Sequence, residues 1–317
     1  MVQISYNKQR NKQLYNFDNC VSFQIENHIF LGRLIRLDNV INTILSKHQY
    51  PLQVSAVVAE SITLAALLAS TIKYQGLFTL QTKSNGPIPM VVVDVTSEGK
   101  IRACADYDES KITKAQKLRK TSGEIEPAPH FMGEGILAFT VDQGANTELY
   151  QGIVDLQGKN LSECAMRYFK QSEQIETYLQ LYLQAPQNEN EQWKTAGVLL
   201  QKIPVKGGQQ ALEEDQVQQA WEQAVIFMQS LQENELFDTS LSSQEILHRL
   251  YHANDLQITQ TREYTFACRC QREKLWNTLH TMEPEDIEDM CENGKITATC
   301  DFCGTTYSFD KGELLKQ

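Results

Sequence analysis

The stretches CRC (268–270) and CDFC (300–303) lie near the C-terminus of a chain of 317 residues. They contain four cysteines in two close pairs, with 29 residues between the pairs. Zinc in structural sites is held by four ligands at the corners of a tetrahedron, and two cysteine pairs from separate segments commonly supply them. The sequence therefore predicts one Zn²⁺ bound by Cys268, Cys270, Cys300 and Cys303, against the alternative of unliganded thiols.

The two pairs differ in their local spacing. Gly304 follows the second pair and tolerates the left-handed backbone of a zinc-binding turn. The first pair encloses a single residue, and we expect the backbone to turn sharply at Arg269 so that both sulfurs reach one metal. The intervening segment is expected to be helical from Gln271 to His280 and again after Pro284, which brings the two pairs together.

The same spacing permits redox chemistry. Zinc keeps sulfur in the reactive thiolate form, and Arg269, Arg272 and Lys274 add positive potential around it. Cysteines two or three positions apart can also close disulfides within a pair. Metal binding in a small domain is worth on the order of 10 kcal/mol of folding free energy, so loss of the metal should unfold that domain.

The remaining four cysteines carry no such pattern. Cys20, Cys104 and Cys164 lie in the body of the chain, and Cys291 lies between the two pairs. We interpret each of them as a buried or incidental thiol.

Composition and charge limit the class of protein. The length predicts two or three domains, and the net charge of -11 argues against a general nucleic-acid binder. The N-terminal residues lack the apolar core of a secretory signal, so we expect a cytoplasmic protein with reduced cysteines. Residues 54–72 are apolar enough to suggest a membrane span, but Glu60 interrupts them and favours a buried core helix.

The hydrophobic pattern of residues 1–205 predicts an α+β core domain. Apolar runs at 77–82, 90–95 and 100–107 indicate a meander of strands. Further strands are expected at 20–37, 135–143, 148–156, 177–184 and 194–204, and helices at 38–50, 54–72 and 161–172.

Composition shifts at 206–210, and we expect a helical linker region over 206–254 followed by a zinc-binding domain over 255–317. The helix expected at 213–232 carries one apolar stripe, formed by Val217, Trp221, Ala224, Met228 and Leu231. One narrow stripe buries little area, so the linker, with a second helix at 243–252, should pack lightly on the core. The stripe is interpreted as a releasable latch, against the alternative of a helix integrated permanently in the core.

No other pattern predicts catalysis. The chain has no phosphate-binding loop or dinucleotide fingerprint, and His248 and His252 share a helix face without a nearby carboxylate motif. Basic residues crowd at 111–120, which indicates a solvated surface, with an anionic partner as the alternative. We therefore expect a protein that is not an enzyme.

Segments along nearly the whole chain resemble the 33 kDa chaperonin family of redox-regulated holdase chaperones. They are GRLIRLD (32–38), HQYP with the apolar helix (48–72), LFTLQ (77–81), GPIPMVVVD (86–94), VDQG (141–144), YQGIV (150–154), YFKQSEQ (168–174), GVLLQKIP (197–204) and CDFCGTTYSF (300–309). Ser84 and Ala196 stand where glycines are usual in the family, and Cys291 is an additional thiol.

The resemblance implies an ATP-independent chaperone that is inactive when reduced and zinc-bound. Oxidation would pair Cys268 with Cys270 and Cys300 with Cys303, release zinc and unfold the linker and C-terminal region. The active form would be a homodimer that binds unfolding proteins, with no membrane and no nucleic acid among its partners. The main alternative is a zinc-ribbon-like nucleic-acid adaptor that uses 111–120, and a zinc hydrolase is disfavoured because four cysteines leave no open position.

Overall fold

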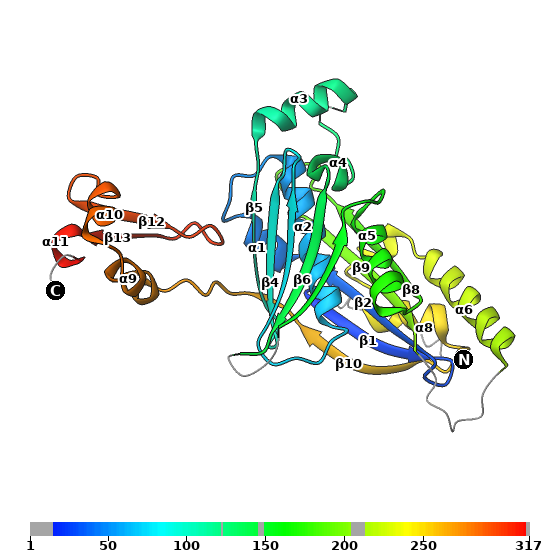
Figure 1. The fold of residues 1–317 in the computed structure, drawn as a ribbon. Helices are drawn as coiled ribbons and strands as arrows, with labels where there is room; N and C mark the ends of the chain where they lie inside the picture. The colour runs from blue at the N-terminus through cyan, green and yellow to red at the C-terminus, as the bar shows by residue number, and fades with distance from the viewer. Residues whose placement is uncertain (1–14, 122, 145–148, 204–212, 315–317) are drawn as a thin grey trace, which may run out of the picture.

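The computed structural model describes residues 15–121, 123–144, 149–203 and 213–314, and two β-sheets form its body (Figure 1). The five-stranded sheet has the order β10-β1-β2-β9-β8, and its strands are antiparallel. Its strands are β1 (Asn19–Ile25), β2 (Phe30–Leu37), β8 (Thr177–Gln184), β9 (Lys194–Lys202) and β10 (Gln257–Glu263).

The six-stranded sheet has the order β11-β5-β4-β3-β6-β7 and is antiparallel except for the β11–β5 pair. Its strands are β3 (Leu77–Ser84), β4 (Met90–Thr96), β5 (Lys100–Asp106), β6 (Gly135–Asp142), β7 (Tyr150–Asp155) and β11 (Thr265–Phe266). The predicted meander is formed by β3, β4 and β5, and the α+β class is confirmed.

Helix α2 (Leu52–Ala69) lies between the two sheets and forms the centre of the main core. It has the length and hydropathy of a membrane span, but 89% of its apolar window is buried inside the protein, which fits the core helix expected from sequence. The first part of the chain contains further short helices: α1 (Asn39–Leu45), α3 (Glu109–Arg119), α4 (Pro129–Met132), α5 (Leu161–Tyr168) and the π-helical turn η1 (Phe169–Glu173).

A second core covers the other face of the five-stranded sheet. Helices α6 (Glu214–Gln229), α7 (Glu233–Leu236) and α8 (Ser243–Tyr251) pack there against strands β1, β2 and β9. The expectation of light packing is wrong, because α7 and α8 bury Leu236, Ile246 and Tyr251 in addition to the stripe on α6.

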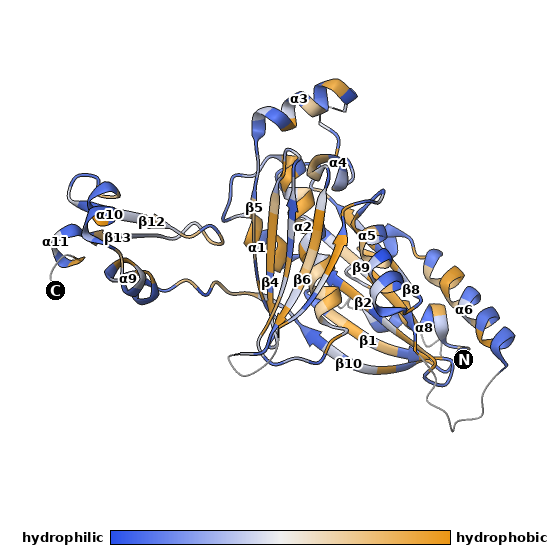
Figure 2. Ribbon diagram, viewed as in Figure 1, coloured by the Kyte–Doolittle hydropathy of each residue, from blue (hydrophilic) through white to orange (hydrophobic). Residues whose placement is uncertain are grey.

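The C-terminal residues form a small module beside the sheets (Figure 1). It consists of α9 (Arg272–His280), α10 (Pro284–Asp289), β12 (Lys295–Thr299), β13 (Thr306–Asp310) and α11 (Lys311–Leu314). Its own core contains five buried apolar residues, Leu279, Ile287, Ile296, Phe309 and Leu314. Figure 2 shows that apolar residues are sparse in this module and dense on the strands and on α2.

Strands β10 and β11 were not expected from sequence. They belong to the range 255–317 but extend the two sheets of the body, and the C-terminal module begins after them. The composition shift at 206–210 lies outside the described residues, so the first domain boundary stays a prediction.

Candidate metal centre

The first cysteine pair leaves the body of the protein at the end of β11. Thr265 and Phe266 pair in parallel with Lys100 and Ile101 of β5, and the Ala267 N–H donates to the Ile101 carbonyl at 3.0 Å. Cys268 follows directly, so the sheet fixes where the CRC stretch begins.

The second pair occupies the turn between β12 and β13. The Cys300 N–H donates to the Thr305 carbonyl at 3.0 Å, and the Gly304 N–H donates to the Cys300 carbonyl at 2.8 Å. Gly304 has a φ of +67°, in the left-handed region that its lack of a side chain allows. A Cβ at this position would also lie 3.2 Å from the Lys47 carbonyl oxygen of the body, so the close approach favours glycine.

The turn gathers all four predicted ligands. The four Sγ atoms lie within 4.8 Å of one another, with 3.7 Å between Cys268 and Cys300 and 3.5 Å between Cys270 and Cys303. Zinc–sulfur bonds of about 2.3 Å in a tetrahedron give sulfur–sulfur edges of about 3.8 Å, so the cluster has the dimensions of a zinc–thiolate site. Four soft donors also complete the coordination sphere, as in structural rather than catalytic zinc sites.

The sharp turn expected at Arg269 is wrong. Residues 268–270 form neither a turn nor a bend. A turn is not needed, because side chains two positions apart along an extended backbone face the same side. Cys268 and Cys270 therefore reach the cluster together, and Arg269 between them points to the body of the protein.

Hydrogen bonds distribute the acidity of the thiols unevenly. Burial alone would raise the pKa of the Cys303 thiol. Hydrogen bonds from the Thr305 hydroxyl and N–H and from the neighbouring thiols have a larger effect, and they lower this pKa from 9.0 to about 6. Burial raises the pKa of Cys300 to about 12. Cys270 Sγ lies 3.3 Å from the Tyr307 hydroxyl, which supplies a further polar neighbour.

A residue from each cysteine pair, Arg269 and Phe302, contacts one member of a salt-bridged pair in the body, Asp94 and Arg102. Arg269 Nη2 donates to Asp94 Oδ2 at 2.7 Å, and Arg102 donates to the same carboxylate at 2.7 and 2.8 Å. The guanidinium of Arg102 in turn lies 3.8 Å from the centre of the Phe302 ring. The sequence patterns gave no signal for Asp94 and Arg102, because the residues they contact lie about 170 to 200 positions further along the chain.

The predicted apolar stripe lies against the five-stranded sheet, with four of its residues on α6 and Leu231 just beyond the end of the helix. Trp221, Ala224, Met228 and Leu231 are buried, and Val217 is partly buried against the same cluster. The Trp221 ring packs edge-on against Phe30 of β2, with 5.4 Å between ring centres.

Sequence reasoning missed Arg36, the main polar anchor of the linker. This residue of β2 is 1% exposed and donates to three backbone carbonyls of the linker, those of Leu236, Asp238 and Leu241, at 2.6 to 2.7 Å. Burial lowers the pKa of Arg36 to about 10, which leaves it charged at neutral pH. An arginine inside an apolar strand, in GRLIRLD, was the available signal.

The other cysteines lie apart from the cluster. Cys20, Cys104 and Cys164 are buried, and burial raises their pKa values to about 11, 12 and 11. Cys291 lies at the opposite end of β12 from Cys300, and the five residues of that strand span about 17 Å. Cys291 therefore cannot join the cluster while the module is folded.

The two remaining candidate patterns lie on the surface. The basic run occupies helix α3, which projects from the body in Figure 1, and Lys111 and Arg119 pair there with Asp108 and Glu126. The rings of His248 and His252 stack at 5.6 Å on the exposed side of α8.

Comparison with known proteins decides the family. The sequence model of the Hsp33 protein family matches residues 18–310. The chain belongs to the Hsp33 family. It is 32% identical over 297 residues to the 33 kDa chaperonin of Caulobacter vibrioides, covering 92% of this chain and 95% of the relative. It is 33% identical to the 33 kDa chaperonin of Pseudomonas fluorescens, with 89% and 87% covered.

A solved structure shows the same fold. The crystal structure of the 33 kDa chaperonin, an HSP33 homologue, from Thermotoga maritima superposes with a TM-score of 0.75 at 22% identity. The match covers 94% of this chain and 97% of that one. The Hsp33 family resemblance proposed from sequence is therefore confirmed, and with it the identity of the chain as a family chaperone.

Proposed function

We propose that this Hsp33-family chain is a redox-regulated, ATP-independent holdase. In the reduced form, Cys268, Cys270, Cys300 and Cys303 would hold one Zn²⁺, which keeps the four sulfurs as thiolates and ties the CRC stretch to the β12–β13 turn. The observation that supports this most is the convergence of four sulfurs at zinc–thiolate spacing, at the junction of the body and the C-terminal module.

Oxidation would break that tie. The two thiolates of a pair lose two electrons and form one S–S bond, and peroxide takes those electrons with two protons to give two waters. Pairing within CRC and within CDFC, as the family resemblance implies, removes all four metal ligands. The five buried apolar residues of the module would then have to hold it alone, so the domain over 255–317 should lose its structure before the core over 1–205.

The domain then controls the linker over 206–254. Chain connectivity supports this step, because β10 and β11 join helix α8 to the cysteine cluster and pair with both sheets. If these strands loosen with the module, α6 to α8 lose their C-terminal attachment and the apolar face beneath them becomes available to unfolding client proteins. The released form would dimerise, and the protein would act in the cytoplasm.

Two measurements on one preparation test the proposal. The reduced wild type should contain one zinc per chain and fail to suppress aggregation of an unfolding client, and peroxide should reverse both properties. The Cys300→Ser/Cys303→Ser variant should contain well under one zinc per chain. Full zinc in that variant would exclude this ligand set, and equal chaperone activity before and after peroxide would exclude redox control.

A further inference from the structure

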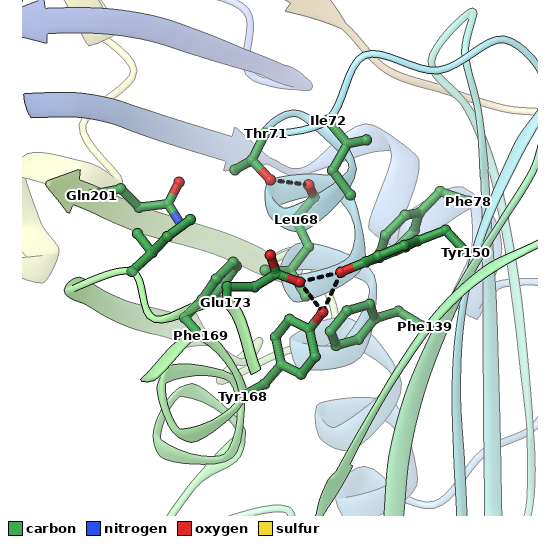
Figure 3. A pocket seen from close by; sticks show the side chains of 11 residues that line it. Leu68, Thr71, Ile72, Phe78, Phe139, Tyr150, Tyr168, Phe169, Glu173 and Gln201 are labelled. Carbon is green, nitrogen blue, oxygen red and sulfur yellow. Dashed lines mark hydrogen bonds between the residues drawn. The ribbon is translucent and has the colours of Figure 1, made fainter. Parts of the chain in front are cut away.

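A cavity of about 330 Å³ opens between the two sheets at the C-terminal end of α2 (Figure 3). Its inner wall is apolar and is formed mainly by Leu68, Phe78, Phe139 and Phe169, each of which is at least 92% buried. An apolar cavity of about 150 Å³ is enough to bind benzene in a protein interior, so this one has room for a larger group. Its described lining includes neither a cysteine of the cluster nor a residue of α6.

A polar group faces this apolar wall. The hydroxyls of Tyr150 and Tyr168 both donate to the Glu173 carboxylate, and Figure 3 shows the three side chains converging. Burial, together with this carboxylate, raises the pKa values of both tyrosines, so their hydroxyls remain donors at neutral pH. The two hydroxyls therefore fix the direction of the carboxylate.

The charge of Glu173 has no cationic partner in the described structure. It is the one charged side chain among the described residues that line the cavity, and no lysine, arginine or histidine described forms an ion pair with it. The exposed Glu173 carboxylate lies at the edge of an aromatic cluster, since its donor Tyr168 packs edge-on against Phe139 at 4.3 Å and against Phe169 at 5.5 Å. A carboxylate among aromatic faces is the chemistry that recognises organic cations.

The backbone that presents Glu173 is unusual. Residues Phe169–Glu173 form a π-helical turn, which ends at Gln174 with a φ of +55°. This turn places both Phe169 and Glu173 on the cavity. Single π-helical turns are rare in proteins, and many of those known lie at functional sites. The segment is part of YFKQSEQ (168–174), which the zinc centre and the linker do not involve.

We propose that this cavity binds a small organic ammonium compound with an apolar body. The apolar body would enter toward Leu68 and Phe78, and the ammonium group would remain near the more exposed Glu173 and contact the faces of Tyr150 and Tyr168. The site faces α2, whereas the linker helices cover the opposite face of the five-stranded sheet. Binding therefore requires neither oxidation nor release of the linker, and it does not depend on the holdase function.

Three probes with a similar phenyl body test the charge preference on the reduced, full-length protein. They are 2-phenylethylammonium, 2-phenylethanol and 3-phenylpropionate, followed by calorimetry and by shifts of aromatic NMR signals. The ammonium probe should bind about tenfold more tightly than the alcohol, and the carboxylate probe more weakly than both. Equal affinity for all three probes, or no binding of the ammonium, would overturn the proposal.

Matched variants locate the site. Glu173→Gln keeps a hydrogen-bond acceptor but removes the charge, and should reduce the preference for ammonium over alcohol to about twofold or less. Glu176→Gln changes an exposed carboxylate three residues further on, which lies 3.6 Å from Lys202, and should keep the full preference. Ile72→Trp should fill the cavity and abolish binding of every probe. Unchanged binding in Ile72→Trp, or an unchanged preference in Glu173→Gln, would place the ligand elsewhere.

One further probe separates two sources of the same chemistry. A capped phenylalanyl-lysine dipeptide carries an ammonium group on a peptide chain, as an unfolded protein would. We expect this dipeptide to bind more weakly than 2-phenylethylammonium, because the peptide backbone of the dipeptide must also enter the cavity. Tighter binding of the dipeptide would contradict a small-molecule site.

Discussion

At the scale of single residues, two buried charges connect distant parts of the chain. Arg36 reaches the linker carbonyls, and Asp94 joins Arg102 of the body to Arg269 of the cysteine segment. Local sequence marks Arg36 only as an arginine inside an apolar strand and gives no signal for Asp94, because each contacts residues more than 170 positions away. The clustering of the four cysteines was predictable, since the short spacing within each pair is typical of metal ligands; their role as zinc ligands stays a prediction.

Replacing Arg36 by methionine should release the linker in the reduced protein. The change leaves up to three linker carbonyls without their charged donor, at a cost of about 2–4 kcal/mol to docking. Hydrogen exchange should show lost protection over 214–251. Arg33→Met is the matched control, because Arg33 lies on the same strand and donates to the Ser70 and Gly32 carbonyls of the body. Equal loss of linker protection in both variants would contradict a specific anchor.

Glu60 should make stability depend on pH. This residue of α2 is largely removed from water, and burial raises the pKa of its carboxyl group from the ordinary 4.5 to about 7. The folded state therefore binds more protons than the unfolded state between pH 4.5 and 7, so stability falls as pH rises through this window. Because the Glu60 side chain retains some exposure, we expect the free energy of unfolding to fall by about 2 kcal/mol across this window, which is less than the full pKa shift would give.

Glu60→Gln should remove this dependence and stabilise the protein at pH 8. Chemical denaturation at pH 5 and pH 8 measures the difference, and Glu109→Gln, at an exposed position of α3, is the control. A wild type whose stability rises between pH 5 and 8, with Glu60→Gln showing the same rise, would exclude this assignment.

At the scale of elements, regular hydrophobic periods predicted most strands and helices of the body. Strand β10 was missed because its residues, QITQTRE, are polar and mostly exposed, and β11 has only two residues. Pairing with β1 and β5 defines them as strands, and such pairing has no local signal. The docking of α7 and α8 was underestimated for a related reason, since a stripe on one helix does not show what its neighbours bury.

The stripe of α6 should act as the latch that the sequence suggests. Trp221→Ser together with Met228→Ser should weaken docking and raise client capture in reduced protein, because each large apolar side chain contributes about 1.5–3 kcal/mol when buried. Zinc content should remain at one per chain. Ile226→Ser, at a position 61% exposed on the same helix, should change neither property. A folded double variant that captures no client until oxidised would show that the stripe is not the latch.

The contact between the cysteine segment and the body should slow metal loss. Asp94→Asn removes the charge that pairs with Arg269 and Arg102, so a chelator should extract zinc about 3- to 10-fold faster from the reduced variant. Asp106→Asn, at the exposed end of β5, is the matched control. Identical extraction rates in the wild type and Asp94→Asn would mean that the body does not stabilise the cysteine segment.

At the scale of the whole molecule, stability is divided unequally. Two large apolar clusters hold the sheets, α2 and the linker helices, whereas the C-terminal module buries only five apolar residues among those described. A small module with so little core should depend strongly on the zinc proposed for the four cysteines. Under the proposed function, oxidation of the four cysteines should therefore act on this module and leave the main core folded.

Zinc release and client capture, recorded together during one peroxide treatment, test this coupling most directly. A chromogenic chelator reports the metal, and light scattering of an unfolding client reports chaperone activity in aliquots of the same reaction. We predict that suppression of aggregation appears only as zinc is released, and that a thiol reductant with added zinc reverses both. Full suppression of aggregation while all four cysteines still hold zinc would contradict a redox-gated chaperone.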